Sequence, residues 1–137
     1  MGMTALTPTQ IAMQWIQNYN SHNPEQAASL YHEQVTNLQL PWGNAVIGRD
    51  AMKHTYEKVF RAFPDITIEA RNIIAEASTV VIEWRFTGTM KGEFAGFAPN
   101  HHSFDMNGCE VFEIVDGLIF RQHGYWDKAT MFSQLQL

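Results

Sequence analysis

The stretch CEVFEIVDGLIFRQHGYWDKATMFSQLQL, residues 109–137, determines how the rest of the chain is interpreted. Apolar and aromatic runs flank Asp116-Gly117, and a two-residue turn of this kind needs positive φ at both centres, which Asp and Gly tolerate. The pattern predicts two long strands joined by a tight turn. Asp127 follows the second strand, and residues 128–135 have the spacing of a short helix. We therefore expect a carboxylate at the end of a curved sheet, beside Tyr125 and Trp126.

The strands before this hairpin are indicated by a change of hydrophobic period at Ile66. Residues 66–75 and 79–89 alternate between apolar and polar side chains, and residues 102–115 are a further strand. In residues 79–89 one face is apolar, while Glu83 and Arg85 lie on the other face, which favours solvent or a dimer contact there. The members of the apolar face are Val80, Ile82, Trp84 and Phe86.

Three helices are predicted ahead of these strands. Thr7, Pro8 and Gln10 have the order of a capping box with proline in the first helical position. Asn23-Pro24 repeats that signal for a short helix through Leu30 and Tyr31, and residues 49–63 form a third helix that Pro64 ends. Between them, residues 35–42 have the pattern of a strand, and Pro41 places it at a sheet edge or at a strand end. The order predicts a single α+β domain over residues 1–137.

Composition excludes several classes of function. The chain has 137 residues, of which 45% are hydrophobic, and a formal net charge of −5. Its nine Lys and Arg are scattered, so nucleic acid is not an expected partner. Residues 1–6 do not resemble a leader, and no apolar window is long enough to span a membrane, which predicts a cytoplasmic protein. The six histidines have no metal-ligand spacing, and no metal or cofactor is expected.

A set of short motifs, in this order along the chain, resembles the SnoaL-like polyketide cyclase branch of the NTF2-like superfamily, to which ketosteroid isomerase and limonene epoxide hydrolase also belong. The resemblance implies a cone, in which a strongly curved mixed or antiparallel sheet wraps around helices and an apolar pocket, and it implies a homodimer. Relatives often have Gly-Thr-His where this chain has Gly88-Thr89-Met90. The motifs are Ile47-Gly48-Arg49-Asp50-Ala51, Phe63-Pro64-Asp65, Phe86-Thr87-Gly88-Thr89, Gly92-Glu93-Phe94, Phe97-Ala98-Pro99, Asp116-Gly117-Leu118-Ile119, Tyr125-Trp126-Asp127 and Gln134-Leu135.

Asp127 is the main candidate catalytic residue, because it matches the acid that polyketide-cyclase relatives use at the end of the last strand. A carboxyl group in an apolar cavity has a raised pKa and can exchange protons near neutral pH. The alternative is that Asp127 caps the following helix, which contributes about 1 kcal/mol. Strand alternation places His123 and Tyr125 on the same face as Asp127. We therefore expect His123 to assist proton transfer and Tyr125 to contact the ligand.

The aromatic residues of the helices, strands and Gly-rich loop predict a pocket for a small apolar or aromatic molecule. Two functions fit such a pocket. The first is a cofactor-independent isomerase, cyclase or hydrolase that acts on an apolar carbonyl-type or polycyclic substrate; the second is a binding module without catalysis. The expected pocket residues are Trp15, Trp42, Tyr56, Phe60, Trp84, Phe94 and Phe97.

Overall fold

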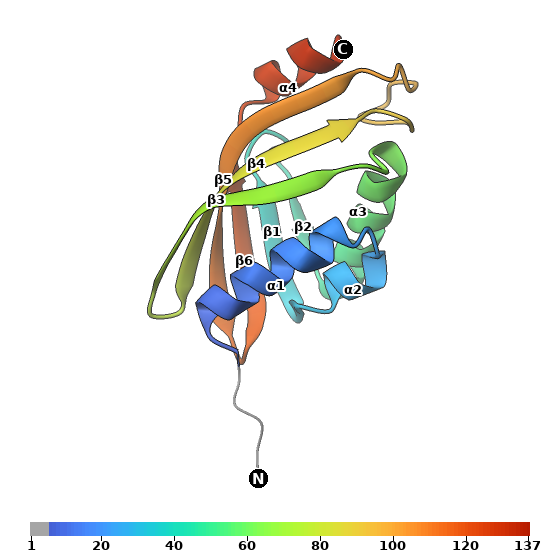
Figure 1. Ribbon diagram of the computed structural model, residues 1–137. Helices are drawn as coiled ribbons and strands as arrows, with labels where there is room; N and C mark the ends of the chain where they lie inside the picture. The colour runs from blue at the N-terminus through green and yellow to red at the C-terminus, as the bar shows by residue number, and fades with distance from the viewer. Residues whose placement is uncertain (1–5) are drawn as a thin grey trace.

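The computed structural model describes residues 6–137 as one six-stranded sheet that curves around three helices, with a fourth helix beside its far end (Figure 1). Residues 1–5, which carry most of the leader prediction, lie outside the described residues. The predicted α+β class is confirmed. The elements are α1 (Pro8–Asn20), α2 (Pro24–Ala28), β1 (Tyr31–Gln39), β2 (Ala45–Ile47), α3 (Arg49–Ala62), β3 (Thr67–Glu76), β4 (Thr79–Thr89), β5 (Ser103–Val115), β6 (Leu118–Tyr125) and α4 (Lys128–Leu135).

The predicted hairpin lies at the centre of the sheet. Asp116 and Gly117 have φ of 53° and 73°, the positive values that the turn requires. The strand order is β2-β1-β6-β5-β4-β3, so β5 and β6 occupy interior positions. All neighbouring strands are antiparallel except β1 and β6, which run parallel. The mixed sheet therefore joins the first strand of the chain to the last.

The helix starts follow their predicted caps. Thr7 accepts a hydrogen bond from the Gln10 backbone N–H, and the Gln10 side chain accepts one from the Thr7 backbone N–H, which completes the capping box of α1. In contrast, α2 ends at Ala28, and Tyr31 begins β1 instead of extending the helix. Pro41 lies just beyond β1, in the turn before the short edge strand β2, whose three residues are too few to give a periodic signal.

The concave face of the sheet carries the core. α1 packs over β3 and β4, and α3 packs against β1 (Figure 1). The apolar face predicted for β4 is buried, with exposed fractions from 0% to 8%. On the convex face, Arg85 donates two hydrogen bonds to Asp105, which agrees with the solvated alternative for that side chain. No helix within residues 6–137 is long and apolar enough to cross a membrane.

Candidate functional site

A cavity of about 180 Å³ lies between α1, α3 and the concave face of the sheet. Its wall is mainly apolar, and the four tryptophans of the chain, Trp15, Trp42, Trp84 and Trp126, all line it. Glu110 of β5 is the one carboxylate among the described residues that line the cavity. A buried acid in an apolar cavity is the arrangement that most often indicates a functional site.

The Glu110 carboxylate is 3% exposed and accepts three hydrogen bonds. Its Oε1 atom accepts from Nε2 of Gln39 at 2.6 Å and from Nε2 of Gln122 at 2.8 Å. Its Oε2 atom accepts from Nε1 of Trp84 at 2.8 Å. A carboxylate offers about four lone-pair positions, so one position on Oε2 is left for a ligand.

The surroundings of Glu110 act on its pKa in opposite directions. Burial raises the pKa of Glu110, and the hydrogen bonds from Gln122, Gln39 and Trp84 oppose that rise. A protonated Glu110 would need an acceptor, but Oε1 of Gln39 already accepts from Trp126 and Oε1 of Gln122 accepts from Tyr31. The network therefore fits the ionised carboxylate, and the raised pKa makes that carboxylate a stronger base.

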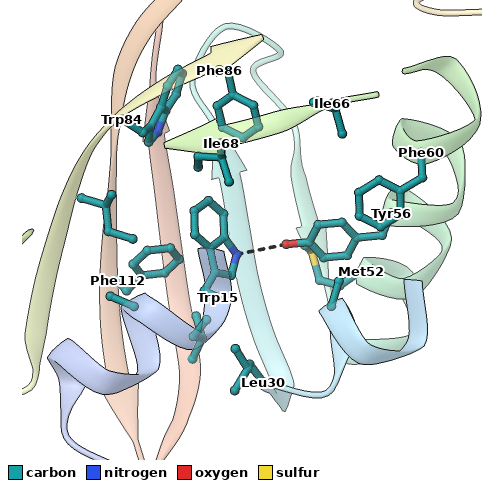
Figure 2. Packing of buried hydrophobic residues seen from close by; sticks show 14 of the residues in the cluster. Trp15, Leu30, Met52, Tyr56, Phe60, Ile66, Ile68, Trp84, Phe86 and Phe112 are labelled. Atoms are coloured by element: carbon teal, nitrogen blue, oxygen red, sulfur yellow. Dashed lines mark hydrogen bonds between the residues drawn. The ribbon is translucent and has the colours of Figure 1, made fainter. Parts of the chain in front are cut away.

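A second group of polar side chains connects the helices to Glu110. The Tyr31 hydroxyl donates to Oε1 of Gln122 at 2.6 Å, so the Tyr56 hydroxyl, which is 2.6 Å from that of Tyr31, donates to Tyr31. Nε1 of Trp15 donates to both hydroxyls, at 3.0 Å to Tyr31 and 3.1 Å to Tyr56, and Figure 2 shows the bond to Tyr56. The chain of donors thus runs from Tyr56 through Tyr31 and Gln122 to the carboxylate.

Tyr19 of α1 also lines the cavity, and its hydroxyl has no hydrogen-bond partner within residues 6–137. Its ring packs against Phe86 and Tyr56, with centroids 5.0 Å and 5.4 Å away. Burial, together with the charges of Tyr56 and Glu110, raises the pKa of Tyr19 well above its usual value. Tyr19 therefore remains protonated and has a hydroxyl hydrogen available for a ligand.

Two glycines make room for this network. A Cβ atom on Gly124 of β6 would lie 1.8 Å from Oε1 of Gln39, and one on Gly108 of β5 would lie 2.5 Å from the Trp84 ring. Any larger residue at these positions would displace a side chain that donates to Glu110. The absence of a side chain at both positions is thus part of the site.

Five of the residues expected to line the pocket do line the cavity: Trp15, Trp42, Tyr56, Trp84 and Phe94. Phe60 instead lies behind the wall, where it stacks on Tyr56 with centroids 5.6 Å apart. Phe97 is 43% exposed and contacts the edge of Phe132 outside the cavity. Helical spacing identified Phe60 as an apolar position but could not separate the inner wall from the layer behind it. Phe97 was expected in the wall because it lies in the Gly-rich loop, whose sequence does not show which way each side chain points.

The structure does not bring the predicted catalytic residues into the cavity. Asp127 is exposed and caps α4, where it accepts hydrogen bonds from the backbone N–H and the hydroxyl of Thr130. The hydrogen bond from the Thr130 side chain lowers the pKa of Asp127, which is the opposite of what an acid–base role near neutral pH needs. His123 and Tyr125 share the convex face of β6, opposite Gln122 and Gly124, and Tyr125 is 42% exposed.

Glu110 was missed, although the sequence contained a signal for it. It has the same parity in β5 as four buried apolar residues, Phe104, Met106, Phe112 and Ile114. An acid that shares the apolar face of an alternating strand is buried when that face packs on the core, and a buried acid needs donors around it. The same alternation places Trp126 in the cavity wall while its neighbours Tyr125 and Asp127 are exposed.

Metal and partner sites have less support in the structure. Within residues 6–137 no group of three or more His, Cys, Asp or Glu side chains is placed to hold a metal ion. The convex face exposes Ile74 at 60% and Tyr125 at 42%, on either side of a shallow depression. The homodimer remains a prediction.

A family model for the SnoaL-like polyketide cyclases matches residues 9–135, nearly the whole chain. The chain belongs to the SnoaL-like polyketide cyclase family. A search of curated proteins found no match. The family model thus covers α1 to α4 together with the cavity described above.

Solved structures with this fold include proteins that are described as having different activities. A protein with a ketosteroid isomerase-like fold from Catenulispora acidiphila, in complex with trimethylamine, has a TM-score of 0.82 at 18% identity, covering 96% of this chain and 95% of that one. AclR of Streptomyces galilaeus, a proposed hydroxylase, has a TM-score of 0.81 at 21% identity, with 94% and 80% covered. IdmH of Streptomyces antibioticus, a proposed polyketide cyclase, has a TM-score of 0.79 at 22% identity, with 96% and 100% covered. At such identities these matches show the fold alone.

Proposed function

We propose that this SnoaL-like protein is a cofactor-independent enzyme of the isomerase or cyclase type, in which Glu110 is the proton-transfer group. The observation that carries the proposal is the buried Glu110 carboxylate, which lines an apolar cavity and is surrounded only by donors. The conjugate acid of a general base usually has a pKa that has been raised toward the working pH, and burial raises the pKa of Glu110. Tyr19 supplies a hydroxyl donor on the same cavity.

The chemistry follows from these two groups. Glu110 removes a proton from the carbon next to a substrate carbonyl, so that the C–H bond breaks and an O–H bond forms on Oε2. The electron pair moves onto the carbonyl oxygen, where the Tyr19 hydroxyl stabilises the developing charge by a hydrogen bond. Glu110 then returns the proton at another carbon of a conjugated enolate. Alternatively, the enolate carbon attacks a second carbonyl within the same molecule, the C=O π bond opens to an alkoxide, and Glu110 gives its proton to that oxygen. Neither outcome changes the oxidation state of the substrate as a whole.

Exchange of carbonyl α-protons in D₂O tests the first step without knowledge of the natural substrate. With cyclohexanone as probe, we expect Glu110→Gln to lower the enzyme-dependent exchange rate by about 10²–10⁴-fold, and Tyr19→Phe to lower it less. Glu83→Gln, on the exposed face of β4, is the matched control and should exchange at the wild-type rate. A folded Glu110→Gln protein with the wild-type exchange rate would overturn the proposal.

A second function, binding of a compact amine without catalysis, is favoured by one observation. No Lys, Arg or His within residues 6–137 forms a salt bridge with Glu110, although aromatic rings surround it, and aromatic walls attract cations. The ketosteroid isomerase-like protein from Catenulispora acidiphila holds trimethylamine. If the cavity serves amine binding, cyclohexylammonium should bind more tightly than cyclohexanol, and Glu110→Gln should remove the difference. Equal binding of the two compounds to the wild type would exclude this alternative.

A further inference from the structure

The size of the cavity sets a limit on its ligand. Its volume is about 180 Å³, whereas pockets for drug-sized ligands usually have roughly 300–1,000 Å³. A cavity of about 150 Å³ holds benzene. The volume therefore corresponds to one ring or a compact pair of fused rings.

The inner walls are held so that the cavity cannot widen there. Trp15 donates hydrogen bonds to the hydroxyls of Tyr31 and Tyr56. Trp84 donates one hydrogen bond to Glu110. Moving either ring outward would leave a buried N–H unsatisfied, which costs about 1–3 kcal/mol. Neighbouring rings also restrict these two side chains. The Phe112 ring, which does not line the cavity, lies 5.1 Å from Trp15, and the Phe86 ring, which lines the cavity beside Trp84, lies 4.6 Å from Trp84 (Figure 2).

The cavity is open to solvent beside Trp42. Trp42, in the turn between β1 and β2, is 37% exposed although it lines the cavity, whereas Glu110 is 3% exposed. The rings around Trp42 meet it edge to face, and its indole N–H makes no hydrogen bond within residues 6–137: Phe94 lies 5.8 Å and Trp126 5.3 Å away. This end, here called the mouth, consists of Trp42, Phe94 and Trp126, and Phe132 packs beside Trp42 outside the cavity. A substituent can therefore extend through the mouth but not past the inner walls.

We propose, on the basis of the function proposed above, that the substrate class is a compact neutral cyclic ketone that enters carbonyl first. The ring fills the cavity with its carbonyl between Tyr19 and Glu110, and any substituent lies on the far side of the ring and points through the mouth. Ketones with bulk next to the carbonyl are excluded, because that bulk would meet the fixed rings of Trp15 and Trp84. Ketones of more than two fused rings are excluded by the cavity volume of about 180 Å³, which corresponds to at most a compact pair of fused rings.

Positional isomers test this orientation directly. 4-tert-Butylcyclohexanone and 2-tert-butylcyclohexanone have the same composition and differ only in where the bulky group lies. We expect the wild type to bind the 4-isomer with a Kd about tenfold lower, or lower still, than the Kd for the 2-isomer. Extra volume in a packed site raises Kd by about that factor. All four tryptophans line the cavity, so quenching of tryptophan fluorescence reports binding. A four-ring steroid ketone should not compete with the 4-isomer.

Two variants distinguish the role of the mouth from the role of the Tyr19 hydroxyl. Trp42→Ala changes only the mouth and should keep the preference for the 4-isomer. Tyr19→Phe removes the hydroxyl that orients the carbonyl and should bring the ratio of the two affinities close to one. Equal binding of both isomers to the wild type, an unchanged ratio in Tyr19→Phe, or competition by the steroid ketone would overturn the inference. These measurements report binding without turnover, so they can fail while the proton-exchange test of Glu110 succeeds, and the reverse also holds.

Discussion

The inner end of the cavity and its mouth are built by different forces. At the inner end, Trp15, Trp84 and Glu110 are 1–3% exposed and joined through directional hydrogen bonds. At the mouth, Trp126 donates one hydrogen bond to Gln39, but the side chains of Trp42 and Phe94 make edge-to-face aromatic contacts, and the Nζ atom of Lys128 lies 5.2 Å from the Trp42 ring centroid. Hydrogen bonds fix position and angle, whereas aromatic and cation–π contacts tolerate several arrangements. The inner end therefore sets which ligand fits, and the mouth sets how easily the ligand enters.

The largest effect should come from removal of the Glu110 carboxylate. Glu110→Ala leaves the donors of Trp84, Gln39 and Gln122 without their acceptor, and we expect a loss of about 3 kcal/mol or more in the free energy of unfolding. Urea denaturation measures this loss. Glu83→Ala, an exposed acid on the neighbouring strand, should change stability by about 0.5 kcal/mol or less. Equal stability of Glu110→Ala and Glu83→Ala would show that the network does not stabilise the inner end.

Gly124→Ala should have the next largest effect, because the new methyl group would occupy the position of the Gln39 amide. We expect a loss of about 1–3 kcal/mol, typical of overpacking. A double-mutant cycle with Gln39→Ala sharpens the test, since Gly124→Ala should cost much less when the Gln39 side chain is absent. Additive losses in the double variant would mean that the clash with Gln39 is not the cause.

These two sites also show where prediction from sequence was sufficient and where it was not. The Asp116-Gly117 turn, the caps of α1 and α2 and the inward face of β4 depend on local chemistry or on a period of two, and all were predicted. The donors around Glu110 come from β1, β4 and β6, and their convergence depends on strand order and register. No local pattern contains that information. Asp127 was predicted as the catalytic residue because it lies in a family motif. To predict Glu110 as a site residue would have required knowledge of how β5 pairs with β4 and β6.

A smaller effect should appear in the pH dependence of stability. Burial raises the folded-state pKa of Glu110 above the usual value of 4.5. Between the unfolded-state pKa and the folded-state pKa, Glu110 holds a proton in the folded chain that it has released in the unfolded chain. The contribution of Glu110 to the free energy of unfolding therefore falls as pH rises through this window. Above the folded-state pKa the contribution is constant. Glu110→Gln cannot titrate. The stability of the wild type minus that of the variant should therefore decrease as pH rises from about 4.5.

Urea titrations of both proteins from pH 4 to 8 measure that difference. Asp105 contributes a slope of the opposite sign at the acid end, mainly below its usual pKa of 3.8, because the hydrogen bond from Arg85 lowers the pKa of Asp105. That slope is common to the wild type and to Glu110→Gln, so subtraction removes it. A difference that increases with pH would mean that the donors, rather than burial, dominate the pKa of Glu110.

The smallest effect is expected for Asp127, at the start of the helix that carries Lys128 and Phe132 to the mouth. Asn caps a helix about as well as Asp, so Asp127→Asn should leave stability within about 0.5 kcal/mol of the wild type, and Asp127→Ala should lose about 1 kcal/mol. Neither variant reaches the cavity, so both should exchange cyclohexanone protons at the wild-type rate, as Glu83→Gln does. A folded Asp127→Asn protein that lost exchange activity would place the proton-transfer group at the mouth. It would then be the exposed cap, and not the buried carboxylate of β5, that performs the chemistry.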